Sequence, residues 1–107
     1  MSESEFIELA EATLAAIERA VDATGVDIEV SRAGNVLTLE LGNESKVVIN
    51  SQAPMQQMWV AGKSGAFHYA HDGSRWIDTR DGSELFAALS RLVSTQGGEA
   101  VALTGQK

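Results

Sequence analysis

Residues 46–61 read K-V-V-I-N-S-Q-A-P-M-Q-Q-M-W-V-A, two β-rich runs joined by a short connection that holds Pro54, the only proline of the chain. Proline lacks the N–H that a sheet ladder needs, so Pro54 separates the two runs into different strands. Side chains alternate across a strand, and a core beneath Met58 and Val60 would leave Trp59 on the opposite face. The stretch therefore predicts two neighbouring strands and a tryptophan turned away from the core.

Amide side chains lie close to Trp59 in the sequence, at Asn50, Gln52 and Gln57. An outward tryptophan among amides is typical of a surface prepared for a partner protein. The same pattern is compatible with a tryptophan that its neighbours simply cover, since single exposed aromatic residues are ordinary. Both interpretations stay open at this point.

The rest of the chain predicts one helix on each side of the strands. Ser2 and Glu5 form a capping box ahead of a helix over 3–23, and Asp81 with Glu84 marks the start of a second helix that ends at Gly97-Gly98. Short runs separated by turns predict five or six strands, at 26–32, 36–41, 46–50, 57–61, 66–70 and 75–77. We predict an α+β fold, a two-layer sandwich in which an antiparallel sheet of five to six strands carries the N- and C-terminal helices on one face. Residues 1–107 are expected to form a single domain with loosely ordered ends, 1–3 and 98–107.

Composition narrows the classes of function. The chain has no cysteine, which excludes disulfides, thiolate catalysis and Cys-ligated clusters. No apolar run approaches the ~20 residues of a membrane span, and M-S-E-S-E lacks the pattern of a signal segment, so we expect a cytoplasmic, bacterial-type protein that binds no membrane. Nucleotide-binding and hydrolase motifs are absent, and His68 and His71 fall on opposite strand faces. We expect no catalytic residues and no histidine metal site.

The net charge of −7 is concentrated at one end of the chain. Residues 1–29 hold eight acids against Arg19 alone, whereas residues 30–107 hold seven acids against seven bases. Such a field repels nucleic acid and attracts cations or a basic protein surface. This inference requires that lysines and arginines do not neutralise these acids in the folded protein.

Three of these acids, Glu11, Glu18 and Asp22, lie within about 20° of one meridian of the first helix, nearly opposite its apolar face. Asp27 and Glu29 continue the negative charge into the next strand. Glu18 and Asp22 are like charges four residues apart, an arrangement that costs a helix about 0.2–0.5 kcal/mol. Their presence despite this cost favours a site for a cation or a partner. Carboxylate oxygens alone suit hard cations such as iron or calcium, and an open ridge of them binds weakly.

The stretch I-N-S-Q-A-P-M-Q-Q-M-W-V-A at 49–61, the aromatic strand after it, the W-I-D turn and the final helix together resemble the frataxin family in its short bacterial form. S-E-F at 4–6, the helix up to Ile17-Glu18 and V-L-T-L at 36–39 agree with it. The resemblance covers about residues 4–98. It implies an α–β-sheet–α sandwich without catalytic residues.

The resemblance also implies weak, reversible binding of Fe(II) and Fe(III), with no cluster or organic cofactor. The implied iron ligands are Glu11, Glu18, Asp22, Asp27 and Glu29. It implies docking to the cysteine desulfurase and the scaffold protein of iron–sulfur cluster assembly, where the protein would donate iron or regulate the desulfurase. The implied partner-binding residues are Glu18, Asp22, Asn50, Gln52, Gln57 and Trp59.

The chain departs from the family pattern at three positions. Arg19 and Ala23 stand where the bacterial family often has acids, which predicts a lower iron stoichiometry, and Ser51 stands where a basic residue is common. A second hypothesis is a pure protein-interaction module whose acids dock a basic partner and whose metal binding is incidental. A third, an iron-oxidising enzyme, needs a defined metal centre that open carboxylates do not favour. We expect a monomer, or an oligomer that forms only with metal.

Overall fold

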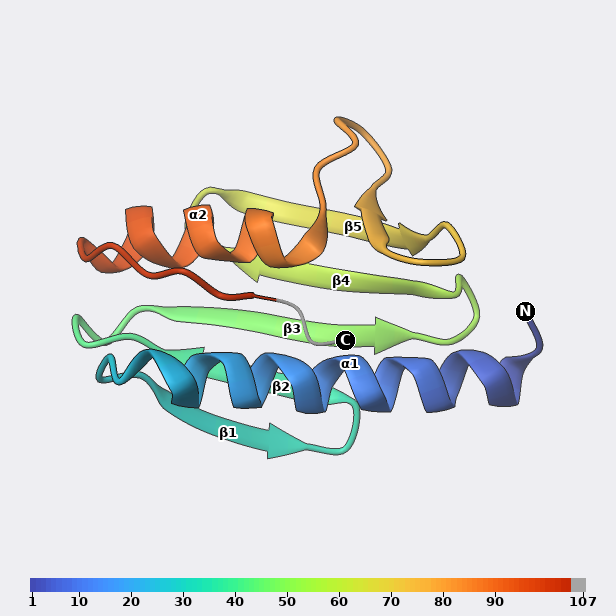
Figure 1. The fold of residues 1–107 in the computed structure, drawn as a ribbon, viewed down its shortest axis with the longest axis horizontal. Helices are drawn as coiled ribbons and strands as arrows, with labels where there is room; N and C mark the ends of the chain where they lie inside the picture. The colour runs from blue at the N-terminus through green and yellow to red at the C-terminus, as the bar shows by residue number, and fades with distance from the viewer. Residues whose placement is uncertain (105–107) are drawn as a thin grey trace.

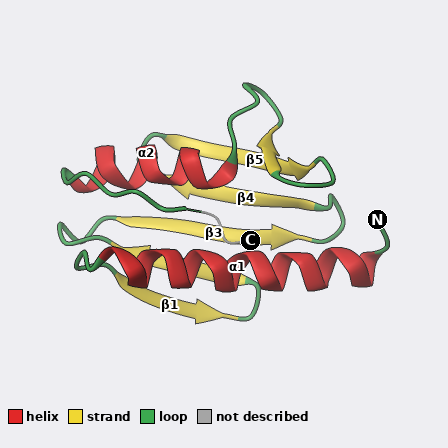
Figure 2. Ribbon diagram, viewed as in Figure 1, coloured by secondary structure: helices red, strands yellow, loops and turns green. Residues whose placement is uncertain are grey.

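The computed structural model describes residues 1–104 and has two layers, a six-stranded sheet and two helices that cover one of its faces (Figures 1 and 2). The helices are α1 (Glu3–Thr24) and α2 (Leu85–Gly97). The strands lie side by side in chain order as an antiparallel meander, β1 (Glu29–Ala33), β2 (Val36–Glu40), β3 (Lys46–Gln52), β4 (Gln57–Gly62), β5 (Gly65–His71) and β6 (Trp76–Asp78). The α+β sandwich predicted from the sequence is confirmed.

Helix α1 forms where its caps and apolar spacing predict it. The Ser2 side chain accepts from the Glu5 backbone N–H, and the Glu5 carboxylate accepts from the Ser2 N–H, which lowers the pKa of Glu5. The helix ends at Gly25, whose φ of 72° is a left-handed conformation that glycine adopts without strain. Phe6, Leu14 and Ile17 on its inner side are fully buried. The predicted end at residue 23 differs from the observed one by a single residue.

Helix α2 begins later than predicted, and the proposed capping box of Asp81 with Glu84 is wrong. Glu84 is itself the N-cap and accepts from the backbone N–H groups of Phe86 and Ala87. A β-bridge between Ile77 and Glu84 holds residue 84 in an extended conformation, so the helix cannot start before it. Asp81 instead closes the preceding turn by accepting from Ser83 N–H, which lowers the pKa of Asp81.

The chain ends are held more firmly than predicted. The Gln56 side chain donates to the Met1 carbonyl, and α1 already begins at Glu3. After α2 the chain runs between the two helices (Figure 1), where Val101 and Leu103 are buried. Val101 and Leu103 thus extend the core between the helices, which the expectation of a loosely ordered end did not foresee. The part of that expectation that concerns 105–107 lies outside the described residues.

The two helices cover the inner face of the sheet (Figure 1). Leu37, Ile49 and Met58 are fully buried there. Trp76, to which the sequence assigned no role, is also buried and donates from Nε1 to the Thr13 hydroxyl of α1 at 2.9 Å. Within residues 1–104 no helix is long and apolar enough to cross a membrane.

Candidate functional site

We define the anionic flank as the surface formed by Glu11, Glu18, Asp22, Asp27 and Glu29. The first three acids lie on α1, Asp27 lies in the connection that follows, and Glu29 is the first residue of β1. Glu11, Asp22, Asp27 and Glu29 are exposed and Glu18 is half-buried. The structure therefore brings the predicted acids to one side of the molecule, where α1 passes the β1 edge of the sheet (Figure 1).

An arginine neutralises part of this flank. The predicted attraction for cations required that no lysine or arginine do so, and that requirement is not fully met. Arg32 of β1 pairs with Glu11 through Nη2 and with Glu18 through Nη1, the latter at 3.1 Å. Its backbone pairs with Leu37, so its side chain starts on the inner face of the edge strand and reaches up to α1. The sequence counted Arg32 within the neutral part of the chain, and only the packing of β1 against α1 places it between two acids.

The Arg32 clamp, as we name this pair of contacts, is half-buried. The side chain of Arg32 is 23% exposed, against 55% for Glu11 and 37% for Glu18. Burial by itself lowers the pKa of Arg32, but the hydrogen bonds to Glu18 and Glu11 outweigh it and raise that pKa. The guanidinium therefore stays charged, and Glu11 and Glu18 can bind a cation only in competition with it.

The remaining three acids form the open part of the flank. Over residues 1–104 no ion pair engages Asp22, Asp27 or Glu29. Residues 1–104 also contain no group of three His, Cys, Asp or Glu side chains close enough to hold one metal ion. Arg19, which the sequence suggested would thin the flank, lies instead against a hollow between the helices. The flank is an open, partly neutralised ridge rather than a preformed metal centre.

The outer face of the sheet carries the predicted amide and tryptophan patch. Asn50 of β3 lies directly opposite Trp59 of β4, and Gln52 lies opposite Gln57. Trp59 is half-buried on the face opposite Met58 and Val60, and its Nε1 donates to the Gln57 carboxamide at 2.9 Å. The hypothesis of an outward tryptophan among amides is confirmed in its geometry.

His68 is part of this patch, although the sequence did not group it there. Its ring stacks on Trp59 with 4.3 Å between ring centroids and 11° between the planes. His71, by contrast, contacts the buried Trp76 on the inner face, so the predicted separation of the two histidines is confirmed. The turn at Gly62–Gly65 sets the register of β4 and β5 and thereby pairs Trp59 with His68. This contact could have been predicted from the sequence by counting residues back from that turn. We call Asn50, Gln52, Gln57, Trp59 and His68 the Trp59 patch.

Charge is sparse on the outer face of the strands. By strand alternation the charged side chains there are Glu29, Glu40 and Lys46, which lie opposite one another in a single cross-strand row. Glu29 belongs both to this row and to the anionic flank. The flank and the outer face therefore meet at one corner, and Glu40 adds an acid there that the sequence did not group with the others.

The class of protein is thus a small, cysteine-free α–β-sheet–α sandwich that has an acidic first helix and an outer sheet face with few charges. The family model of the frataxin-like domain matches residues 1–99. The chain is 59% identical to the iron-sulfur cluster assembly protein CyaY of Cupriavidus taiwanensis over 102 residues, 92% of each chain. It is 56% identical over 108 residues to the protein of that name from Janthinobacterium sp., 96% of each. The chain belongs to the frataxin family.

Solved structures agree with this assignment. Frataxin from Psychromonas ingrahamii superposes with a TM-score of 0.90 at 38% identity, covering 97% of this chain and 99% of that one. Trimeric frataxin from Saccharomyces cerevisiae complexed with ferrous iron superposes with a TM-score of 0.66 at 26% identity, covering 92% and 88%. Family and fold are therefore established together.

Proposed function

We propose that this protein is a non-enzymatic, iron-binding component of iron–sulfur cluster assembly that docks to a cysteine desulfurase and a scaffold protein. The observation that carries the proposal is the junction of the anionic flank with the outer sheet face at Glu29. One basic partner surface can contact the acids and the Trp59 patch together, and iron held on the flank lies beside that interface. The names of the relatives and the ferrous complex of the yeast frataxin support the assignment.

The open part of the flank is the favoured iron site. Asp22, Asp27 and Glu29 are exposed and unpaired within 1–104, whereas Glu11 and Glu18 must first leave Arg32. Open carboxylates without an enclosing loop hold hard cations weakly, with Kd values on the order of 10⁻⁴–10⁻³ M, the weak end of oxygen-ligand sites. Weak binding suits iron that is passed on as cargo.

Iron binding is tested by an anaerobic Fe(II) titration of the ¹⁵N-labelled protein. We expect the amides of 22–29 to broaden first, and those around Glu11 and Glu18 at higher iron. The double variant Asp22→Asn/Asp27→Asn should weaken binding at least fivefold. Its matched control is Glu3→Gln/Glu8→Gln, which removes the same charge about 20–30 Å away from Asp22 along α1. Equal affinities of the two variants would remove the flank from the proposal.

The alternative, a protein-interaction module with incidental metal binding, is favoured by the Arg32 clamp, which occupies two of the five acids. The two functions differ in how the desulfurase binds. Under the proposed function, Fe(II) changes the affinity for the desulfurase and the Asp22→Asn/Asp27→Asn variant loses this effect. Under the alternative, added salt weakens binding through screening but Fe(II) leaves it unchanged.

The non-enzymatic part of the proposal has its own test. A ferroxidase would consume O₂ with Fe(II) over many turnovers. We expect oxidation of excess Fe(II) in the presence of the protein to follow the rate of Fe(II) in buffer, as read by ferric absorbance. A saturable rate enhancement that Asp22→Asn/Asp27→Asn abolishes would instead assign the protein to the iron-oxidising class.

A further inference from the structure

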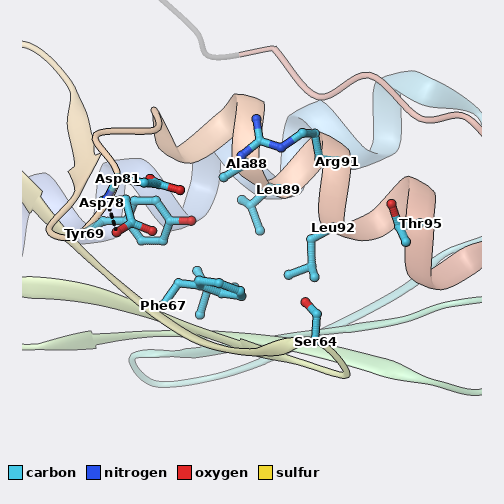
Figure 3. Close-up of a pocket in the computed structure, with 11 residues that line it drawn as sticks. Ser64, Phe67, Tyr69, Asp78, Asp81, Ala88, Leu89, Arg91, Leu92 and Thr95 are labelled. Carbon is cyan, nitrogen blue, oxygen red and sulfur yellow. Dashed lines mark hydrogen bonds between the residues drawn. The ribbon is translucent and has the colours of Figure 1, made fainter.

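A hollow of about 310 Å³ opens between α2 and the inner face of β4 and β5, on the side of the sheet opposite the Trp59 patch and away from the anionic flank (Figure 3). Its floor is apolar, with Phe67 from β5 and Leu89 and Leu92 from α2. This volume lies at the lower end of small-molecule sites, which start near roughly 300 Å³. We call the hollow the α2–β5 pocket, and it has room for one ring-sized group.

The hydroxyl of a tyrosine whose ring is buried lies at this pocket. Tyr69 is 2% exposed, and Figure 3 shows its hydroxyl directed toward the apolar floor. Among the 11 lining residues the figure marks no hydrogen bond to that hydroxyl. A phenolic oxygen both donates and accepts, so it can bond a ligand that enters the pocket. The Tyr69 hydroxyl is thus a polar group offered to whatever enters the pocket.

The charges around the pocket are predominantly negative. Asp78 and Asp81 line it together with Arg91, whose Nη2 donates to the Ser83 hydroxyl at 3.3 Å. Burial, with smaller contributions from the carboxylates of Asp78, Asp81 and Glu84 and an opposing effect of Arg91, raises the pKa of Tyr69 to about 12. The pocket lining itself holds two acids, Asp78 and Asp81, against one base, Arg91, and this net negative charge favours a cation.

Of the two lining carboxylates, Asp81 is the one exposed at the mouth. Asp78 is buried, and its Oδ1 accepts from the backbone N–H groups of Arg80 and Asp81. Asp81 is exposed, and its Oδ1 accepts a single N–H, that of Ser83. A cationic group at the mouth would therefore bond Asp81 and the Tyr69 oxygen.

We propose that the α2–β5 pocket binds a small aromatic amine. The ring lies on Phe67, Leu89 and Leu92, and the protonated amine bonds the Asp81 carboxylate and the Tyr69 oxygen. With about ten heavy atoms and a ligand efficiency of about 0.3 kcal/mol per atom, the Kd is expected near the millimolar range. The site requires neither the anionic flank nor the Trp59 patch, so it stands or fails separately from the proposed function.

The test is a titration of the ¹⁵N-labelled full chain with phenethylamine, read from amide shifts. We expect saturable shifts at 64–69 and 88–92 with a millimolar Kd. Two control compounds separate the contributions of the ring and of the charge to binding. The first, 3-phenylpropionate, keeps the ring but reverses the charge, and the second, butylamine, keeps the charge without the ring. Each should bind at least about tenfold more weakly. Equal binding of 3-phenylpropionate, or no saturable shift with phenethylamine, would overturn the proposal.

Variants locate the site. Asp81→Asn keeps an oxygen for Ser83 N–H but loses the charge, and should weaken phenethylamine about fivefold, whereas Tyr69→Phe should weaken it about threefold. Asp72→Asn is the matched control, because Asp72 closes a similar turn by accepting from Ser74 and Arg75 N–H groups away from the pocket. Ala88→Phe should fill the pocket and abolish binding. An Asp81→Asn protein that melts like the wild type and binds phenethylamine equally well would refute the assignment.

Discussion

The two tryptophans of the chain lie on opposite faces of one sheet and have opposite environments. Trp76 of β6 is 4% exposed, contacts Phe6 edge-to-face at 5.9 Å and bonds Thr13 of α1. Trp59 of β4 is half-buried, stacks on His68 and alternates with the buried Met58 and Val60, so it lies on the face of the sheet opposite α1 and α2. Residue type alone does not separate them. Strand parity and the side of the sheet that the helices occupy make Trp76 a core residue and leave Trp59 on the outer face of the sheet.

The largest loss of stability is expected from substituting the tryptophan on the inner face of the sheet. Trp76→Ala should destabilise the protein by about 3–5 kcal/mol, because it leaves a cavity between β6 and α1 and removes the N–H that donates to the Thr13 hydroxyl. Trp59→Ala should cost about 1 kcal/mol or less. Urea unfolding followed by circular dichroism measures both. Similar losses in the two variants would contradict the assignment of Trp76 to the core.

The inner face also predicts a loss of stability in alkali. Tyr69 is the only tyrosine, and its pKa of about 12 lies above the unfolded value of about 10. The folded state thus keeps its proton when the unfolded state loses it, so this contribution is present below pH 10 and is lost as pH rises from 10 to 12. Its full size is about 2–3 kcal/mol.

Phenolate absorbance at 295 nm follows Tyr69 directly, since no other tyrosine contributes. We expect a midpoint near pH 12 in the folded protein and near 10 in denaturant. In Tyr69→Phe the steep fall in stability between these values should flatten. A midpoint near 10 in the folded protein would contradict the burial of this side chain.

The proposed role of Trp59 on the outer face is tested by measuring the affinity for a partner protein. Trp59→Ala should weaken binding of the cysteine desulfurase or the scaffold protein about 30-fold, as expected for an aromatic residue at the centre of an interface, and should leave the fold intact. Ser31→Ala, on the same face but away from the Trp59 patch, is the control and should bind normally. Isothermal titration calorimetry measures both. An unchanged affinity of Trp59→Ala would assign Trp59 a merely structural role.

The smallest effect is expected at the edge between the two faces, where Arg32 reaches α1. Arg32→Gln should cost up to about 1 kcal/mol of stability, since a half-exposed ion pair is screened by solvent. It should also free Glu11 and Glu18 and raise the Fe(II) affinity a few-fold. Arg80→Gln, which removes the same charge at an exposed residue, is the control for net charge. Tighter iron binding in both variants would mean that total charge alone sets the affinity.

Most of the fold could be predicted from the sequence because its signals are local. The capping box at Ser2, the alternation of Leu37 and Leu39 and the single proline each act over a few residues. The errors lie where a distant segment intervenes. The bridge between Ile77 and Glu84 delays α2, and the groove between the helices holds Val101 and Leu103 although their segment reads as a polar tail.

The candidate site divides in the same way. The chain order by itself determined which acids share a helix meridian and that Trp59 faces away from Met58, because both follow from the fixed periods of helix and strand. Only the tertiary structure decided that Arg32 binds Glu11 and Glu18 and that Tyr69 faces a pocket. These contacts join residues of different elements, and their energies depend on distances that the packing of helices on the sheet alone sets.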